Sequence, residues 1–387
     1  MIDKSGWSKV KLGDVVQHVK DIVNIETCDL EYYLGGEHFN TDDLHINGKG
    51  VIEGSTIGPA FIMRFKPGQV LLVSRNPHLR KMAVVDFEGI CSNVTYVCET
   101  KSELLLQEFL PFVMRSGDFW RFAESNKRGS TNFYLNWTDF ARYEFFLPPI
   151  EEQERISKLL WAADHILQKH ILVKENLKLV KESLLFKYFD NNKIKKFLPI
   201  GNVLEMCQYG LSLPLVVEAK YPVFRMMNIE NGKIVANDLK YINLDEENLK
   251  KYCLKKDDIL FNRTNSTELV GKVGIFKLEG DYVFASYLIR LRAKQDIIIP
   301  DILNYILNMS IYQQRIRAFI SFGVSQSNIN AQNLKKVNVP ILPIHVQKEL
   351  FHKMKFIEES ECRINESIQD NFETLTSLIN FYSGGAN

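Results

Sequence analysis

Two long stretches of the chain repeat apolar side chains in alternating steps of three and four residues. The first stretch starts just after Pro148-Pro149, and the second starts after Pro343. This rhythm is typical of a helix that buries one seam against a partner helix. The first seam comprises Ile156, Leu159, Ala163, Ile166, His170, Val173, Leu177, Val180 and Leu184. The second comprises Leu350, Met354, Ile357, Glu361, Ile364, Ile368, Asn371, Leu375 and Leu378.

The two predicted helices pair most simply with each other, and we expect an antiparallel coiled coil. Glu361 and Asn371 interrupt the second seam with polar side chains, and His170 interrupts the first. We expect His170 to be a packed or partly exposed histidine rather than a ligand. The alternative is that each helix packs on its own domain.

The segment Phe146–Ile156, FLPPIEEQERI, marks the point where a domain ends and a helix begins. Proline does not fit inside a strand ladder or a helix interior, but it is tolerated in the first helical turn. Glu151, Glu152 and Glu154 follow, and their negative charge is favourable near a helix N-terminus. In the second copy Pro343 keeps the break, whereas the acidic run is reduced to Glu349.

The chain is an internal duplication. With one offset of 194 residues and no gap, Gly129–Ile156 aligns with Gly323–Leu350, and matched pairs include Asn136 with Asn330 and Gln153 with Gln347. Weaker matches link the segments 66–76 and 255–265. The sequence therefore predicts four segments: a domain over 1–148, a long helix over 149–196, a second domain over 197–343 and a second long helix over 344–387.

Each predicted domain mixes short strands with a few helices. Short apolar runs alternate with turn residues, and Asn231-Gly232 is typical of a hairpin turn. The segments 104–125 and 300–320 have helical spacing. The predicted class is α+β: two tandem mixed α/β domains separated by two long helices that pair as an antiparallel coiled coil, with an internal pseudo-twofold duplication.

Composition and charge exclude several classes of protein. The net charge is +1, and 45% of the residues are hydrophobic, which is ordinary for a globular protein. The first domain has 16 basic and 19 acidic residues, and the second has 18 and 14, so their net charges are −3 and +4. The six cysteines have no metal-binding spacing, and no signal peptide or membrane-spanning run is evident. We expect a cytoplasmic protein with reduced thiols.

Sequence motifs of catalysis are missing. The chain contains no GxxxxGK[ST] phosphate loop, no GxSxG nucleophile elbow and no HExxH metal motif. The tetrapeptide and glycine-rich loop of amino-methyltransferases are absent as well. We therefore expect a non-catalytic protein that binds and positions, with no cofactor or metal of its own.

In its duplication and its proline breaks, the chain resembles the specificity (S) subunit of type I restriction–modification systems. The carriers are LPPIEEQERISKLLWAADHI with the long helix after it, the weaker echo ILPIHVQKELFHKM, the segments YPVFRMMNIENGKI and KKDDILFNRT, and the glycine-led stretch before each break. The resemblance covers nearly the whole chain. One departure is the eroded second proline–glutamine segment.

This resemblance implies a function in prokaryotic phage defence. Two target recognition domains would each read one half of a bipartite, asymmetric sequence in double-stranded DNA. The two helices would set the spacer between the half-sites and dock two methyltransferase (M) subunits, through which two restriction/translocase (R) subunits join. The chemistry of AdoMet, ATP and Mg²⁺ would reside in those partners, so that the assembled complex is a DNA adenine methyltransferase and an ATP-dependent endonuclease.

Polar residues in loops that follow strands are the candidates for DNA contact, because arginine, asparagine and glutamine reach base edges while lysine, serine and threonine reach phosphates. In the first domain they are Ser74, Arg75, Asn76, Arg80, Lys81, Lys127, Arg128, Ser130, Thr131, Asn132 and Tyr134. In the second domain they are Asn262, Arg263, Thr264, Asn265, Ser266, Lys272, Ser325, Gln326, Ser327 and Asn328. The alternative for each is an ordinary polar loop residue. The matched Gly129 and Gly323 are expected to let a loop approach other backbone closely.

Apolar residues that flank the seams are the candidates for subunit docking. They are Leu160, Trp161, Leu167 and Leu172 in the first helix and Phe351, Phe356 and Phe372 in the second. Two helices alone cannot bury both the seam and these flanks, so a partner helix would complete a bundle. The alternative is that these residues pack on the recognition domains.

Three other interpretations compete with the specificity subunit. A related methylation-only or ATP-independent system would use the same recognition chemistry. A self-contained restriction enzyme or methyltransferase would need catalytic motifs. A coiled-coil adaptor that joins two protein-binding domains would show no sequence-dependent binding of DNA.

Overall fold

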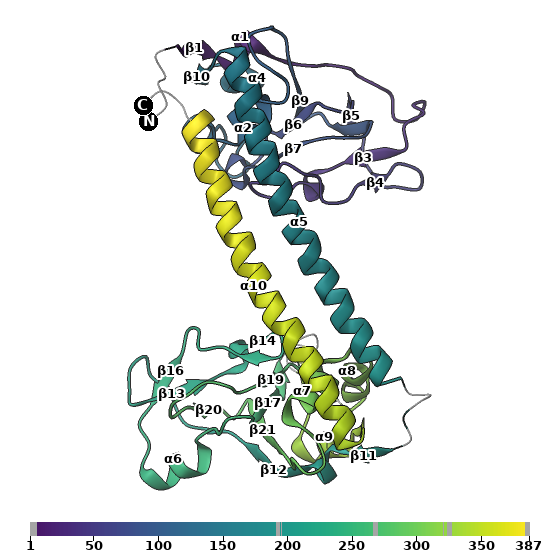
Figure 1. The fold of residues 1–387 in the computed structure, drawn as a ribbon, viewed down its shortest axis with the longest axis vertical. Helices are drawn as coiled ribbons and strands as arrows, with labels where there is room; N and C mark the ends of the chain where they lie inside the picture. Colours follow the sequence, from purple (N-terminus) through teal and green to yellow (C-terminus); the bar gives the residue numbers. More distant parts are fainter. Residues whose placement is uncertain are drawn as a thin grey trace. The chain divides into compact units, whose positions relative to one another are not determined.

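Two compact units make up the protein. The computed structural model describes residues 6–190, 194, 196–265, 270–319, 321–322 and 327–383. Unit 1 consists of Met1–Val173 with Ile364–Asn387, and unit 2 consists of Lys174–Arg363. The two long helices, α5 (Ile150–Tyr188) and α10 (Ile344–Ser383), each contribute one part to each unit (Figure 1). The units differ from the four predicted segments because each part of a helix packs on the unit to which it belongs.

Unit 1 is built on two four-stranded sheets, with spatial orders β2-β9-β6-β7 and β4-β3-β8-β5, and a ribbon of β1 and β10. The strands are β1 (Ser8–Lys11), β2 (Val16–His18), β3 (Tyr32–Leu34), β4 (Gly50–Val51), β5 (Phe61–Phe65), β6 (Val70–Val73), β7 (Met82–Val84), β8 (Gly89–Ser92), β9 (Thr95–Thr100) and β10 (Glu144–Leu147). The short helices are α1 (Leu12–Val15), α2 (Leu110–Arg115), α3 (Gly117–Ser125) and α4 (Trp137–Phe140).

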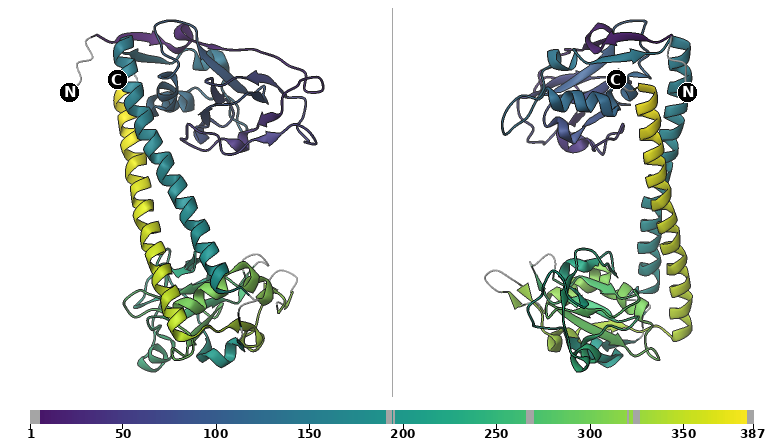
Figure 2. Two further views of the ribbon diagram at one scale, coloured as in Figure 1. Left: turned by 45° about the vertical axis from the view of Figure 1, so that its right-hand side comes forward. Right: turned by 90° about the vertical axis from the view of Figure 1, so that its left-hand side faces the viewer.

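The central strand β6 explains the layers of unit 1, because its four residues are all buried. Side chains alternate between the two faces of a strand. Val70 and Leu72 join the core beneath α2, α3 and the long helices, whereas Leu71 and Val73 join the core against the second sheet. A run of four apolar residues without polar alternation is therefore the signature of a strand buried on both faces. Figure 2 shows the two four-stranded sheets of unit 1 on one side of the long helices.

Unit 2 repeats this plan with a six-stranded sheet of order β12-β21-β17-β19-β15-β14, two three-stranded sheets (β16-β13-β20 and β18-β23-β22) and a ribbon of β11 and β24. The strands are β11 (Phe197–Pro199), β12 (Leu204–Tyr209), β13 (Tyr221–Phe224), β14 (Ile229–Glu230), β15 (Lys233–Ile234), β16 (Lys240–Ile242), β17 (Ile259–Asn262), β18 (Thr264–Asn265), β19 (Val273–Ile275), β20 (Val283–Phe284), β21 (Leu288–Ala293), β22 (Ser321–Phe322), β23 (Ser327–Asn328) and β24 (Asn338–Pro340). The short helices are α6 (Glu246–Tyr252), α7 (Pro300–Asn308), α8 (Ser310–Arg317) and α9 (Ala331–Lys336).

The duplication predicted from the sequence is confirmed by the strand topology. The order β2-β9-β6-β7 in unit 1 corresponds to β12-β21-β17-β19 in unit 2, and the parallel pair β3·β8 corresponds to β13·β20. The predicted hairpin is also confirmed: Asn231 and Gly232 both have positive φ and join β14 to β15. The sequence therefore predicted the repeated α+β plan and the two long helices correctly.

The matched glutamines perform the same task at the start of both long helices. In unit 1 the buried amide of Gln153 accepts from the backbone N–H of Leu106 and donates to the carbonyls of Leu104 and Pro148, over 2.7–2.9 Å. In unit 2 the buried Gln347 makes the equivalent three bonds over 2.8–3.0 Å: it accepts from the backbone N–H of Ile299 and donates to the carbonyls of Ile297 and Leu342. Each glutamine thus joins its helix to the loop before the short helices and to the proline break.

Within each unit the two long helices lie side by side. In unit 1 Leu160 and Leu167 of α5 share a core with Leu375 and Ile379 of α10, and the N-terminal end of α5 lies next to the C-terminal end of α10 (Figure 2). The two polar seam positions of unit 1 are partners: the amide Nδ2 of Asn371 lies 2.9 Å from Nδ1 of His170.

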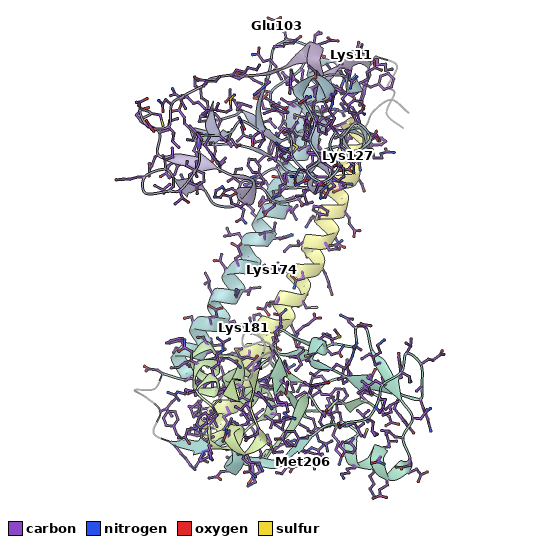
Figure 3. All side chains as sticks on the ribbon, turned by 180° about the vertical axis from the view of Figure 1, so that it is seen from behind. Lys11, Glu103, Lys127, Lys174, Lys181 and Met206 are labelled. Atoms are coloured by element: carbon purple, nitrogen blue, oxygen red, sulfur yellow. The ribbon has the colours of Figure 1, made fainter. Side chains whose placement is uncertain are left out.

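In unit 2 the pairing is antiparallel as well. Lys181 of α5 lies 3.4 Å from Glu361, whereas Tyr188, further along α5, donates to Glu349, which comes earlier on α10. Figure 3 shows Lys181 on α5 in unit 2. The polar seam residue Glu361 therefore has a cationic partner on the facing helix.

The seam predicted for α5 has the correct period, but four of its nine members are exposed. Ile156 is buried and His170 is partly buried, but Leu159, Ile166, Val173 and Val180 are 42–52% exposed. The neighbouring row with Leu160 and Leu167 is buried instead. The seam predicted for α10 is confirmed, since its members are buried or half-buried.

Candidate nucleic-acid interface

The structure brings the two candidate segments of unit 1 together. The segment after β6 pairs with the segment after α3, because Arg75 forms a β-bridge with Tyr134. The backbone N–H of Asn76 donates to Phe133 (2.9 Å), and that of Leu135 donates to Ser74 (3.1 Å). Polar residues that are about 60 positions apart in the sequence therefore form one continuous edge.

The candidates that follow β6 differ in their exposure. Ser74 is buried, and its hydroxyl donates to the carbonyl of Val94 (2.7 Å), so its side chain is not exposed to a ligand, and its contact with DNA stays a prediction. Ser74 lies two residues after Leu72, so its side chain points to the same inward face as that of Leu72. Arg75 and Arg80 are exposed, and Arg80 lies 3.5 Å from Asp42. Asn76 is half-buried with left-handed backbone, and half-buried Lys81 donates to the carbonyl of Gly36 (2.5 Å).

The segment after α3 forms an exposed turn. Ser130, Thr131 and Asn132 are exposed, with Arg128 and the half-buried Tyr134 bridging the turn by two backbone hydrogen bonds of 2.8 and 3.0 Å. Gly129 has φ of +91°, and a Cβ there would lie 2.7 Å from the carbonyl oxygen of Asn132. The expected close backbone approach at Gly129 is therefore confirmed.

Two cations of this turn have partners within the unit. Lys127 is exposed, pairs with Glu124 (2.9 Å) and lies 4.4 Å from the ring centroid of Phe133. Arg128 donates two hydrogen bonds of 2.7 and 2.8 Å to the buried Asp139, and this guanidinium is the main reason why the pKa of Asp139 is lowered. The guanidinium of Arg128 is thus already paired with a carboxylate of its own unit.

Unit 2 brings the corresponding segments together. Strand β18 pairs with β23, so that Thr264 lies opposite Asn328 and Asn265 lies opposite Ser327. The backbone N–H of Ile329 donates to Arg263 (3.0 Å). Arg75–Tyr134 and Thr264–Asn328 occupy the same place in the two copies, as the weak match between 66–76 and 255–265 predicted.

The candidates of unit 2 also differ in their exposure. Asn262 is fully buried at the end of the central strand β17, on the same face as Leu260, and its contact with DNA stays a prediction. Lys272 is exposed, and Arg263, Thr264 and Asn328 are half-buried. Ser266, Ser325 and Gln326, together with Gly323, lie outside the described residues, and the side chains of Asn265 and Ser327 are not described.

Sequence reasoning missed aromatic residues at both edges. In unit 2 Tyr209 and Tyr287 are 39% and 49% exposed, and the guanidinium carbon of Arg263 lies 4.7 Å from the Tyr209 ring centroid. In unit 1 the rings of His18, Tyr96 and Trp137 cluster beneath the edge, and burial lowers the pKa of His18 to about 4, helped by Lys20. No sequence signal identifies these residues, because most of them come from strands and loops that are distant in the sequence from the candidate segments.

The predicted docking residues divide into two groups. Leu160 and Leu167 are buried, and Trp161, Phe351 and Phe372 pack against the cores of their own units, so the expectation of an exposed flank is wrong for these five. Trp161 also donates to the carbonyl of Glu108 (3.0 Å). Leu172 and Phe356 are 56% and 66% exposed and stay candidates for docking.

An exposed apolar surface on α5 extends beyond Leu172, the one member of it that the sequence predicted for docking. The misassigned seam residues belong to it, and we call this surface the outer face of α5. It comprises Leu159, Ile166, Leu172, Val173, Leu179, Val180 and Phe186. A solvent-facing helix surface with this much apolar area is typical of an interaction site.

The described residues offer neither a metal centre nor a membrane span. No group of three histidine, cysteine, aspartate or glutamate side chains among them could hold a metal ion. Over the same part of the chain, no helix combines the length and the apolar character needed to cross a bilayer.

In a comparison with known proteins, both halves of the chain match the same family model. The model of the type I restriction modification DNA specificity domain matches the chain twice, over residues 4–175 and 189–373. The type I restriction enzyme MjaVIII specificity subunit of Methanocaldococcus jannaschii is 25% identical over 397 residues, covering 91% of this chain and 86% of the relative. The EcoKI specificity subunit of Escherichia coli K12 is 20% identical over 356 residues, covering 85% and 75%.

One further relative matches only part of the chain, and one solved structure matches its fold. Another relative from M. jannaschii is 29% identical over 173 residues, and this chain spans only 41% of that relative's length. The crystal structure of a type I restriction–modification system S subunit from M. genitalium superposes with a TM-score of 0.61 at 12% identity, over 100% of this chain and 98% of the other. This structural likeness concerns the fold.

Proposed function

The chain belongs to the type I restriction modification DNA specificity family, and from this membership we propose that it selects the DNA sequence on which a type I restriction–modification complex acts. In this proposal unit 1 reads one half of a bipartite target in double-stranded DNA and unit 2 reads the other half. The long helices set the length of the unread spacer between the half-sites.

One observation carries this proposal. Both units place polar and cationic side chains on a backbone edge built in the same way, from the segment after the central strand and the segment before the long helix. The scaffold is repeated, but the side chains on it differ: Arg75 and Tyr134 in unit 1 stand where Thr264 and Asn328 stand in unit 2. Different side chains read different bases, so the target is asymmetric rather than palindromic.

The outer face of α5 is the proposed docking surface for methyltransferase subunits. Its members lie 42–65% exposed along a single helix, and a partner helix would bury them in a bundle. Two methyltransferase subunits and, through them, two restriction/translocase subunits would complete the complex. We propose that AdoMet, ATP and Mg²⁺ bind to these partners and that this chain supplies recognition without catalysis.

Single-molecule methylation sequencing of the host genome, with this gene intact and deleted, tests the proposal. We expect one asymmetric bipartite motif to lose its methylation on deletion. A matched strain carrying the chain with unit 2 residues 197–343 replaced by those of a relative should change one half of the motif only. Loss of both halves of the motif would contradict the assignment of one half-site to each unit.

The adaptor alternative makes an opposite prediction. A protein-binding adaptor would retain no duplex in a sequence-dependent way at about 0.15 M salt, where nonspecific binding of DNA is weak. If the purified complex binds random and motif-containing duplexes equally at this salt concentration, the specificity function is wrong.

A further inference from the structure

Arg75 differs from the other arginines of unit 1 in its hydrogen bonding. Arg75 is exposed, and among the described residues it has neither a carboxylate nor a carbonyl acceptor. The other seven arginines of unit 1 each have an acceptor: Arg64, Arg80, Arg115, Arg121, Arg128, Arg142 and Arg155. An arginine without a structural partner, on the edge built from both candidate segments, is available to a ligand.

The ring of Tyr134 limits where this guanidinium can lie. The guanidinium carbon of Arg75 is 5.4 Å from the ring centroid, a distance at which the cation and the ring attract each other. Tyr134 itself is fixed, because its backbone forms bridges with both Arg75 and Arg128. This contact leaves the N–H groups of the Arg75 side chain without a hydrogen-bond acceptor among the described residues.

Unit 2 contains a similar arginine–tyrosine contact, formed by residues at other positions of the repeat. Arg263 lies on the ring of Tyr209, which is at the end of β12 rather than in the turn before the long helix. Tyr209 is fixed by its hydroxyl, which accepts a 2.8 Å hydrogen bond from the backbone N–H of Ala331 at the start of α9. One terminal nitrogen of Arg263 donates weakly to the carbonyl of Ser286 (3.4 Å).

The chemistry that fits a guanidinium held in a fixed plane is a planar pair of acceptors. Guanine presents O6 and N7 side by side in the major groove, and arginine contacts them through two parallel hydrogen bonds. Phosphate does not require a fixed plane, and exposed lysines such as Lys272 or Lys127 can contact it as point charges. The tyrosine contact is therefore more useful for reading a base than for binding the backbone.

We propose that Arg75 and Arg263 each read a guanine, one in each half-site, and that Tyr134 and Tyr209 are positioning residues that hold them. This inference rests on the proposed function. It states that each half of the recognised motif contains a G·C pair read by arginine, even though the two arginines occupy different positions in the repeat.

The test uses the full chain in complex with its methyltransferase partner and a library of duplexes with randomised half-sites. We expect the wild type to select a G·C pair in each half. Arg75→Lys should lower the preference for one of these pairs about tenfold to a hundredfold, because a bidentate contact becomes a single one. Arg263→Lys is the matched control and should relax the pair in the other half-site only.

The tyrosines provide the readout of positioning. Tyr134→Leu should relax the same base pair as Arg75→Lys, whereas Tyr134→Phe keeps the ring and should keep the preference. Thermal unfolding of each variant shows whether the fold is retained. A Tyr134→Leu variant that folds and selects the same base as the wild type would overturn the positioning role.

Two outcomes separate failure of the inference from failure of the proposed function. If Arg75→Lys weakens binding to all duplexes equally and lowers the salt dependence instead, Arg75 contacts phosphate and the inference is wrong while the function stands. If the wild-type complex selects no sequence from the library, the proposed function itself fails.

Discussion

Gln153 shows how one side chain can fix the position of a long helix. It is completely buried, and its amide satisfies three backbone groups of two different segments. Its repeat partner Gln347 accepts from Ile299 N–H and donates to the carbonyls of Ile297 and Leu342. The recurrence of all three bonds in the second unit explains why the sequence match between the copies is strongest here.

Gln153→Leu should destabilise unit 1 without changing side-chain volume greatly. The N–H of Leu106 and the carbonyls of Leu104 and Pro148 would lose their side-chain partner at part-buried or buried positions, and we expect a loss of about 2–4 kcal/mol in the free energy of unfolding. Urea unfolding of the purified chain measures this loss. Gln369→Leu, on the exposed surface of α10, is the control and should change stability by less than about 0.5 kcal/mol. Equal effects of the two substitutions would contradict this role.

His45 joins the recognition domain of unit 1 to α5 and makes the connection sensitive to pH. Its Nε2 lies 2.6 Å from Oδ2 of the buried Asp164, and this hydrogen bond raises the pKa of His45 against the opposing effect of burial. Asp43 also favours the protonated ring and Arg115 opposes it, while the Trp161 ring packs nearby. A raised folded-state pKa gives stabilisation that is full below the unfolded pKa of about 6.5 and is lost as pH rises through the folded pKa.

The wild type should therefore exceed His45→Gln in unfolding free energy by more at pH 5.5 than at pH 8.5. Urea unfolding at both pH values gives the two differences. Asp164→Asn should reduce the pH dependence of this difference, since it removes the strongest of the groups that favour the charged ring. The same stability difference at both pH values would show that the contact does not depend on the charge of His45.

At the scale of elements, the sequence predicted the period of α5 and could not predict its phase. Leu159 and Leu160, and likewise Ile166 and Leu167, are adjacent apolar pairs, so two neighbouring rows fit the same heptad rhythm. The core of unit 1 decides which row is buried, and that core is assembled from segments distant in the sequence. The same limit explains Ser74 and Asn262, whose polar side chains looked like loop residues but face inward from strands buried on both faces.

The exposed row of α5 leads to a prediction about assembly. Leu172→Glu should weaken binding of the methyltransferase partner at least about tenfold, because a charge would be buried in the new interface, and should leave unfolding unchanged. Leu167→Glu, five residues earlier on the same helix, is the matched control: it places a charge in the core and should unfold unit 1. Titration of labelled partner and thermal unfolding report the two effects. Full partner affinity in Leu172→Glu would place the docking surface elsewhere.

For the whole molecule, duplication followed by divergence explains how two units with the same strand order carry different side chains on their edges. The conserved parts are those that fix backbone: the sheet order, the two glutamines and the antiparallel contacts between the long helices. The divergent parts are the side chains on the two edges. Under the proposed function, the half-sites would change through the edges and the spacer length through the helices, and these two changes should be independent.

Lengthening both helices should therefore change the spacer alone. A heptad inserted between Val173 and Lys174 of α5, together with one between Ser367 and Ile368 of α10, adds about 10 Å of helix and keeps the seam in phase. DNA rises about 3.4 Å per base pair, so methylation sequencing should show the same two half-sites with about three more base pairs between them. A heptad added to α5 alone would mismatch the antiparallel contacts and should reduce methylation instead. If the double insertion leaves the spacer length unchanged, the helices do not set it.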